Sequence, residues 1–186
     1  MDFRLVRILR DTDVQEILSG TPRRLGTHIR FANHYQILQD GPLAEGEGVL
    51  LGYDLPEDGV HCVSLYRCLD GRYLYHDSTP RPMHHLVRRF MQIHNIPQEQ
   101  VTIVDAIVQG PVFHTCAYHA LAFLDIVSSV VIEDSWLVVH HYKEAIRSFF
   151  PDELVVLRVF RMIGEFHNTI NLTATSIYDS VLPPVH

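Results

Sequence analysis

The segment Gln109-Gly-Pro-Val-Phe-His-Thr-Cys116 places a side-chain amide seven residues before a cysteine. The following run, residues 117–131, is apolar on nearly every face and predicts a helix buried in the core. Cys116 would lie in the first turn of this helix, where unpaired backbone N–H groups and the helix dipole favour a thiolate, the nucleophilic form of cysteine. A free cysteine among apolar residues is more often a small buried hydrophobe, so the prediction of chemistry depends on partners elsewhere.

A thiol nucleophile needs a base that takes its proton and a third group that orients this base. His61 lies in the β-rich run 59–66 and Asp77 in the run 73–78, with an Asp-Gly turn signal between the two runs. We expect the runs to form a hairpin of antiparallel strands. The sixteen residues that separate His61 from Asp77 would then bring both side chains to the same end of the sheet.

The order His61, Asp77, Gln109, Cys116 resembles the adenovirus maturation proteinase, adenain, which also has a Gly-Val-His strand and a Val-Gln-Gly-Pro block before its cysteine. The chain is similar more broadly to the clan that holds the SUMO-specific and related ubiquitin-like proteases. The resemblance is closest over residues 58–85 and 107–123, with a weaker match at 24–31.

The resemblance implies that Cys116 attacks the scissile carbonyl, and that His61 is first its base and then the acid that protonates the leaving amine. Asp77 would orient His61. Gln109 and the backbone N–H of Cys116 would donate to the oxyanion, and each such donor is typically worth about 10² to 10³ in rate. The implied fold is the α+β fold of adenain and the ubiquitin-like proteases, in which a central mixed or antiparallel sheet packs against helices and the nucleophile begins a buried helix.

Three features depart from the family pattern. Cys62 follows His61 where the family usually has tryptophan, and Ala117 follows Cys116 where glycine is common. Adenoviral enzymes are activated by a peptide that forms a disulfide with a cysteine between the acidic residue and the glutamine, but residues 78–115 contain no cysteine. The sequence requires no cofactor, and the resemblance leaves a non-covalent peptide or DNA activator open.

Length and composition predict one domain over residues 1–186, with ordinary globular values of 47% hydrophobic and 20% charged residues. The net charge of −7 makes binding to nucleic acid weak or absent. The sequence shows no signal peptide and no membrane span, and its three cysteines fit a reducing compartment. We therefore expect an intracellular protein, in the host cytoplasm or nucleus or packaged in virions, and not a secreted one.

The remaining pattern predicts helices over residues 12–19, 81–95 and 136–150, an edge strand over 49–53 and a strand over 100–106. Residues 153–166 fit either a helix or a strand. Thirteen histidines raise the question of a metal, and His114, Cys116 and His119 form a compact H-x-C-x-x-H. No second ligand pair completes a site, so no metal is expected, and His119 would be a surface residue near the cleft if it faces solvent.

Two classes of function follow from these residues. The first is a cysteine endopeptidase, viral or derived from a virus-like element, whose partners are precursor structural proteins that it cleaves during particle maturation. A deconjugating protease or an acyltransferase of the same clan would use the same chemistry. The second class is an inactive relative that binds capsid or host proteins, and the intact set of four site residues argues against it.

Overall fold

A five-stranded mixed sheet forms the centre of the structure, in the spatial order β1-β2-β3-β4-β5. The structure is a computed structural model and describes residues 9–20, 28–55, 59–79, 81–106, 109–110, 115–147, 152, 154–159 and 161–162. The strands are β1 (His28–Asn33), β2 (Glu47–Leu55), β3 (Gly59–Arg67), β4 (Tyr73–His76) and β5 (Val101–Val104). Strands β2, β3 and β4 are antiparallel neighbours, whereas β1 joins β2 and β5 joins β4 in parallel. The predicted α+β class with a mixed sheet is confirmed.

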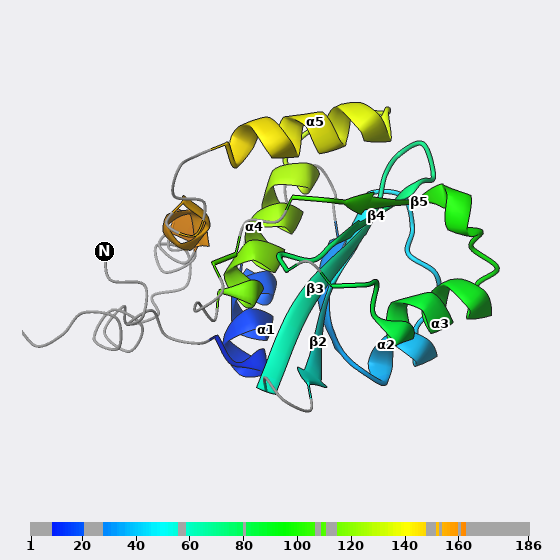
Figure 1. Ribbon diagram of the computed structural model, residues 1–186, viewed down its shortest axis with the longest axis horizontal. Helices are drawn as coiled ribbons and strands as arrows, with labels where there is room; N and C mark the ends of the chain where they lie inside the picture. The colour runs from blue at the N-terminus through cyan, green and yellow to red at the C-terminus, as the bar shows by residue number, and fades with distance from the viewer. Residues whose placement is uncertain are drawn as a thin grey trace, which may run out of the picture.

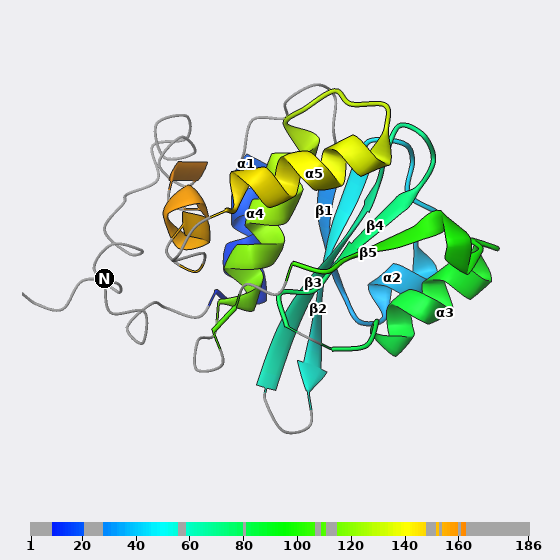
Figure 2. The ribbon, with the colours of Figure 1, turned by 45° about the horizontal axis from the view of Figure 1, so that its top comes forward.

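Helices cover both faces of this sheet (Figure 1 and Figure 2). They are α1 (Asp11–Gly20), α2 (Gln36–Gln39), α3 (His85–Ile93), α4 (Cys116–Ser128) and α5 (Ser135–Ala145), with a short 3₁₀ helix at Gln98–Gln100. Helices α1, α4 and α5 lie on one face, and α2 and α3 lie on the other. Successive side chains of a strand point to opposite faces, so Cys62 and Tyr66 of β3 pack on the α4 side, whereas Val63 and Leu65 pack on the α3 side.

Helix α4 is buried almost along its whole length, as its apolar sequence predicts. Of its thirteen residues, eleven are buried. The sheet covers one side of the helix, and α5 together with residues 155–159 packs in the same core. The hydroxyl of Ser64 on β3 donates a hydrogen bond of 3.1 Å to the carbonyl oxygen of Ala120. This bond fixes the position of α4 along β3.

The predicted hairpin of β3 and β4 is confirmed. Its turn has Gly71 at a φ of 80°, and the carboxylate of Asp70 accepts a hydrogen bond of 3.0 Å from the backbone N–H of Arg72. The β3–β4 register ends at the pair of Ser64 and His76. The first residues of β3, which include His61, therefore extend past the end of β4.

The sequence prediction for β2 was wrong in one respect, because β2 is an interior strand rather than an edge strand. Strand β1 covers its outer side; its sequence His-Ile-Arg-Phe-Ala-Asn begins with the polar–apolar alternation of a strand, but no strand was predicted there. The helix predicted over residues 81–95 begins only at His85, because the ring of His84 caps the first turn by accepting from the N–H of Leu86. Residues 154–159 and 161–162 are helical, which decides between the two alternatives.

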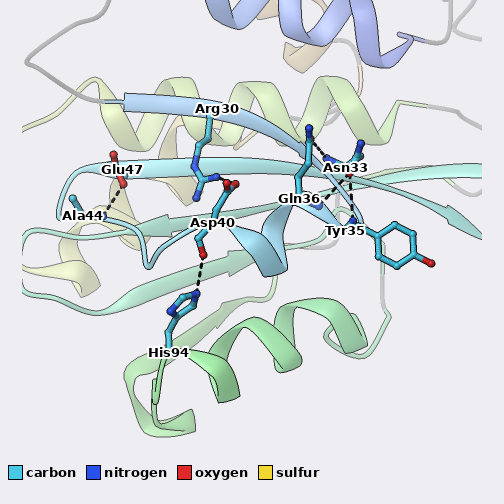
Figure 3. A network of polar contacts seen from close by, with 8 residues as sticks. All are labelled: Arg30, Asn33, Tyr35, Gln36, Asp40, Ala44, Glu47 and His94. Atoms are coloured by element: carbon cyan, nitrogen blue, oxygen red, sulfur yellow. Dashed lines mark hydrogen bonds and ion pairs between the residues drawn. The ribbon is translucent and has the colours of Figure 1, made fainter.

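Polar contacts hold β1, α2 and the end of α3 together (Figure 3). Arg30 forms an ion pair with Asp40, and the backbone oxygen of Asp40 meets Nε2 of His94 at 3.1 Å. The carboxamide oxygen of Asn33 accepts hydrogen bonds from the N–H groups of Tyr35 (3.4 Å) and Gln36 (3.2 Å). These bonds start the short helix α2 and hold Tyr35 at the surface beside it.

None of the helices within the described residues combines the length and the apolar character that crossing a membrane would require.

We predict that Gly48→Ala destabilises the fold by about 1–3 kcal/mol, because an added methyl group overpacks the contact between β2 and α4. A Cβ atom at Gly48 would lie 2.7 Å from Cδ2 of Leu124, which is fully buried. Gly41→Ala is the matched control, since a Cβ there meets nothing within 4 Å. Urea unfolding should separate the two variants, and equal stability would show that Leu124 can move aside without cost.

Candidate active site

The side chains of His61 and Asp77 meet at one end of the β3–β4 hairpin. Nε2 of His61 lies 2.9 Å from Oδ1 of Asp77, and both side chains are buried. The same carboxylate oxygen accepts hydrogen bonds from the backbone N–H (2.9 Å) and the hydroxyl (2.8 Å) of Thr79. Burial alone would raise the pKa of Asp77, but these bonds to His61 and Thr79 lower it. The carboxylate is therefore a fixed anion that holds one ring nitrogen of His61.

Cys116 begins α4, as predicted; the residue is half-buried, and its thiol interacts with His61 and Cys62. A hydrogen bond from the thiol of Cys62 is the largest effect that lowers the pKa of Cys116; burial opposes it, and His61 adds to it. Burial alone would lower the pKa of His61, but hydrogen bonds to Asp77 and Cys116 raise it to about 9. The two shifts run in opposite directions, and both favour the thiolate–imidazolium form of the pair.

Gln109 forms two hydrogen bonds with Ser78, the residue that follows Asp77. Its backbone N–H donates to the carbonyl oxygen of Ser78 at 3.2 Å, and its side-chain Oε1 accepts from the hydroxyl of Ser78 at 2.7 Å. With Oε1 used in this way, the group that the amide offers as a donor is its NH₂. Val108, Pro111 and His114 of the predicted motifs lie outside the described residues.

A second histidine–aspartate pair, His119 and Asp152, lies beside Gly110 and Thr115. Oδ1 of Asp152 lies 3.0 Å from Nε2 of His119 and accepts a hydrogen bond of 2.6 Å from the hydroxyl of Thr115. Its other oxygen, Oδ2, accepts from the backbone N–H of Gly110 at 3.0 Å. Burial would raise the pKa of Asp152, but its bonds to His119, Thr115 and Gly110 lower it. One carboxylate thus joins Gly110 and Thr115 to His119 of α4.

His119 does not face solvent, so the condition under which it would be a surface residue near the cleft is not met. The residue is fully buried, and its ring nitrogen Nε2 bonds to the carboxylate of Asp152. The same bond commits one nitrogen of the H-x-C-x-x-H motif to a carboxylate. Among the described residues, no three histidine, cysteine or acidic side chains gather as a metal site would need.

The ring of Tyr53 packs against His61 from the neighbouring strand. The two residues are direct partners in the β2–β3 register, and their rings meet edge to face at 5.5 Å and 78°. On its other side Tyr53 stacks on His84, with ring centroids 3.7 Å apart. A pocket of about 200 Å³ opens beside these rings, lined by His34, Tyr35, Tyr53, His84, His85 and Leu86. The ring of Tyr53 separates this pocket from His61.

Sequence reasoning missed Tyr53, Ser78 and Asp152 as parts of this site. Ser78 follows Asp77 directly, and this adjacency was the available signal for it. Tyr53 could be found only through the β2–β3 register, in which it faces His61. Asp152 reaches the site from 33 residues beyond His119, and its place after Pro151 indicated only the end of a helix.

No protein-family model matches this chain, and no curated protein matches it in sequence. The structure is similar to that of the Xanthomonas campestris effector protein XopD bound to ubiquitin, with a TM-score of 0.45 and 14% identity over 75% of this chain and 92% of XopD. It is also similar to HopZ1a in complex with IP6 and CoA, with a TM-score of 0.48 and 14% identity over 88% of this chain. The match spans only 54% of the HopZ1a chain.

Both structures share only 14% identity with this chain, at TM-scores below 0.5. At this level of similarity, the functional argument rests on the geometry of the site itself.

We predict that iodoacetamide alkylates Cys116 far faster than Cys68, because burial and the charge of Asp70 raise the pKa of Cys68 to about 12. The rate at Cys116 should stay nearly constant as the pH falls from 8 to 6, since its lowered pKa keeps it a thiolate. In His61→Ala the imidazolium is lost, so the labelling curve should shift to higher pH. Peptide mass mapping measures each cysteine, and equal rates at Cys116 and Cys68 would contradict the ion pair.

We predict that Asp152→Asn lowers the free energy of unfolding by about 1–3 kcal/mol, because the bonds to Gly110, Thr115 and His119 lose their charge. The folded-state pKa of Asp152 is lowered, so its stabilisation is complete above the unfolded pKa of about 4 and is lost as the pH falls through the folded pKa. Asp105→Asn is the control, since Asp105 is exposed. Urea unfolding at several pH values tests this prediction. An equal fall in the free energy of unfolding in both variants would show that the bonds of Asp152 do not stabilise the fold.

Proposed function

We propose that the protein is a cysteine endopeptidase, with Cys116 as the nucleophile and His61 as the base and acid. Asp77 orients His61, and Gln109 with the backbone N–H of Cys116 stabilises the oxyanion. The observation that carries the proposal is the meeting of the Asp77-bound ring of His61 with the sulfur of Cys116 at the first turn of a buried helix. This arrangement prepares a thiolate before any substrate arrives.

In the first half of the reaction, the thiolate of Cys116 attacks the carbonyl carbon of the scissile peptide bond and a C–S bond forms. The carbonyl oxygen becomes an oxyanion, which accepts hydrogen bonds from the Gln109 amide and from the N–H of Cys116. That N–H belongs to the first helical turn, whose N–H groups have no acceptor within the helix. The imidazolium of His61 then gives its proton to the leaving nitrogen, and the C–N bond breaks.

In the second half, water hydrolyses the resulting thioester. Neutral His61 takes a proton from the water as its oxygen attacks the thioester carbon, and the same donors hold the second oxyanion. The C–S bond breaks and Cys116 leaves as a thiolate beside the newly charged ring. Throughout both steps the bonds from Thr79 and His61 keep the carboxylate of Asp77 in place, so the ring cannot turn away.

The substrates that we propose are precursor structural proteins cut during the maturation of a viral or virus-derived particle, in the host cytoplasm or nucleus or within the particle. The support for this finer proposal is the resemblance of the His61 strand and the Gln109–Cys116 segment to the adenoviral proteinase. An activating peptide would act without a disulfide to residues 78–115, and the net charge of −7 limits any role of DNA.

Cys116→Ala should lower the rate of cleavage of a precursor substrate by about 10⁴ or more while leaving the fold intact. Gln109→Ala should lower kcat by about 10² to 10³, because one oxyanion donor is removed. Cys68→Ala is the matched control and should cleave normally. Cleavage assays and circular dichroism measure both effects, and undiminished cleavage by Cys116→Ala would end the protease proposal.

Ubiquitin and SUMO probes with a C-terminal electrophile distinguish the possible acyl donors. Precursor processing requires that these probes fail to label Cys116 while a precursor peptide probe succeeds. Labelling by a ubiquitin-like probe alone would assign a deconjugating enzyme, and transfer of an acetyl group to a peptide amine would assign an acyltransferase. Failure of every probe on a folded, alkylatable protein would leave a binding protein.

A further inference from the structure

Cys62 occupies a fixed place opposite Cys116. Cys62 and Ser64 lie two residues apart on β3 and face α4, while Cys116 and Ala120 lie one turn apart on α4. Two strand residues span about 6.6 Å and four helical residues span about 6 Å, so the two spacings match. The bond from Ser64 to Ala120 therefore sets Cys62 beside Cys116. In agreement, hydrogen bonding to Cys62 is the largest effect that lowers the pKa of Cys116, and the same interaction raises the pKa of Cys62.

The two sulfurs differ in the way that a redox pair requires. Cys116 is the half-buried one and carries the thiolate, so it is the sulfur that a small oxidant meets. Cys62 is only 4% exposed, and its hydrogen bond to Cys116 together with burial raises its pKa. It therefore keeps its proton and reacts only with a neighbour. Cys68 is buried six residues further along the chain, about 20 Å away at strand spacing.

We propose that Cys62 and Cys116 are a redox modification site, which hydrogen peroxide closes into a reversible disulfide that protects the sulfur of Cys116. The thiolate of Cys116 attacks one peroxide oxygen, the O–O bond breaks, and Cys116 becomes a sulfenic acid while hydroxide leaves. The sulfur of Cys62 then attacks the sulfur of Cys116. The S–S bond forms, the S–O bond breaks, and the proton of Cys62 leaves with the departing oxygen as water.

A thiol reductant reverses the change, because two equivalents of thiol are oxidised as both cysteines return to the reduced state. While the disulfide exists, Cys116 is not a nucleophile. It is also shielded from oxidation to the sulfinic acid, which thiols cannot reverse. The inference uses the sulfur of the proposed nucleophile, but it does not require that the protein cleave peptides.

The test is to treat the full reduced chain with equimolar hydrogen peroxide, alkylate the remaining thiols and map the peptides without reduction. Before alkylation, the mass of the protein should be two hydrogens below that of the reduced chain. The peptide map should then contain one cross-linked peptide that joins Cys62 to Cys116. Dithiothreitol should restore both the mass and the rapid alkylation of Cys116. Because these readouts are masses, they remain decisive even if the peptidase assay fails.

Two matched variants make the test specific. Cys68→Ser should form the same cross-link. Cys62→Ser keeps a hydroxyl that can donate to the thiolate but cannot form a disulfide, so two equivalents of hydrogen peroxide should take Cys116 to the sulfinic acid, with a mass gain of two oxygens that dithiothreitol does not remove. A cross-link to Cys68, or irreversible oxidation of Cys116 at the same rate with and without Cys62, would overturn the proposal. Circular dichroism of each variant checks the fold.

Discussion

The burial of α4 against β3 is the constraint on which the rest of the structure depends. A helix that is apolar on nearly all sides is stable in water only when other elements cover it, and here the sheet, α5 and the helical residues 155–159 share that task. The hydrogen bond from Ser64 to Ala120 then fixes the helix along the strand. As a result, α4 begins near the part of β3 that extends past β4, and its first residue, Cys116, lies beside His61.

The charges of the site are arranged so that each buried carboxylate has donors. Asp77 is held by His61 and Thr79, and Asp152 by His119, Thr115 and Gly110. An unpaired buried charge would cost several kcal/mol, so these bonds are what allow two anions near one helix end. His76 is fully buried, and its Nε2 lies 2.8 Å from the hydroxyl of Tyr142. Burial and the nearby His119 lower the pKa of His76 to about 3. It stays neutral and adds no competing charge.

Local patterns predicted the hairpin and α4, because a turn signal and an apolar run carry their structure within a few residues. The sequence alone also predicted that His61 and Asp77 lie at one end of the hairpin, since strand pairing follows from the turn. What it could not predict depends on contacts distant in sequence. Strand β1 is defined by its parallel pairing with β2, and Asp152 by bonds to residues at least 33 positions earlier. The short alternation in β1 does not identify its partner strand, and Asp152 carries no local signal.

His61 and the next residue, Cys62, have different neighbours because of the geometry of the strand. His61 and Cys62 are adjacent, so they point to opposite faces of the sheet. The aromatic support of His61 comes from its register partner Tyr53, on the same face. Position 62 is therefore not needed to hold the histidine ring. Facing α4 instead, it is available to act on the nucleophile, and a cysteine there both donates to the thiolate and lies within reach of its oxidised form. In the proposed redox pair, Cys62 thus controls the sulfur of Cys116, whereas Asp77 and Tyr53 hold the ring of His61.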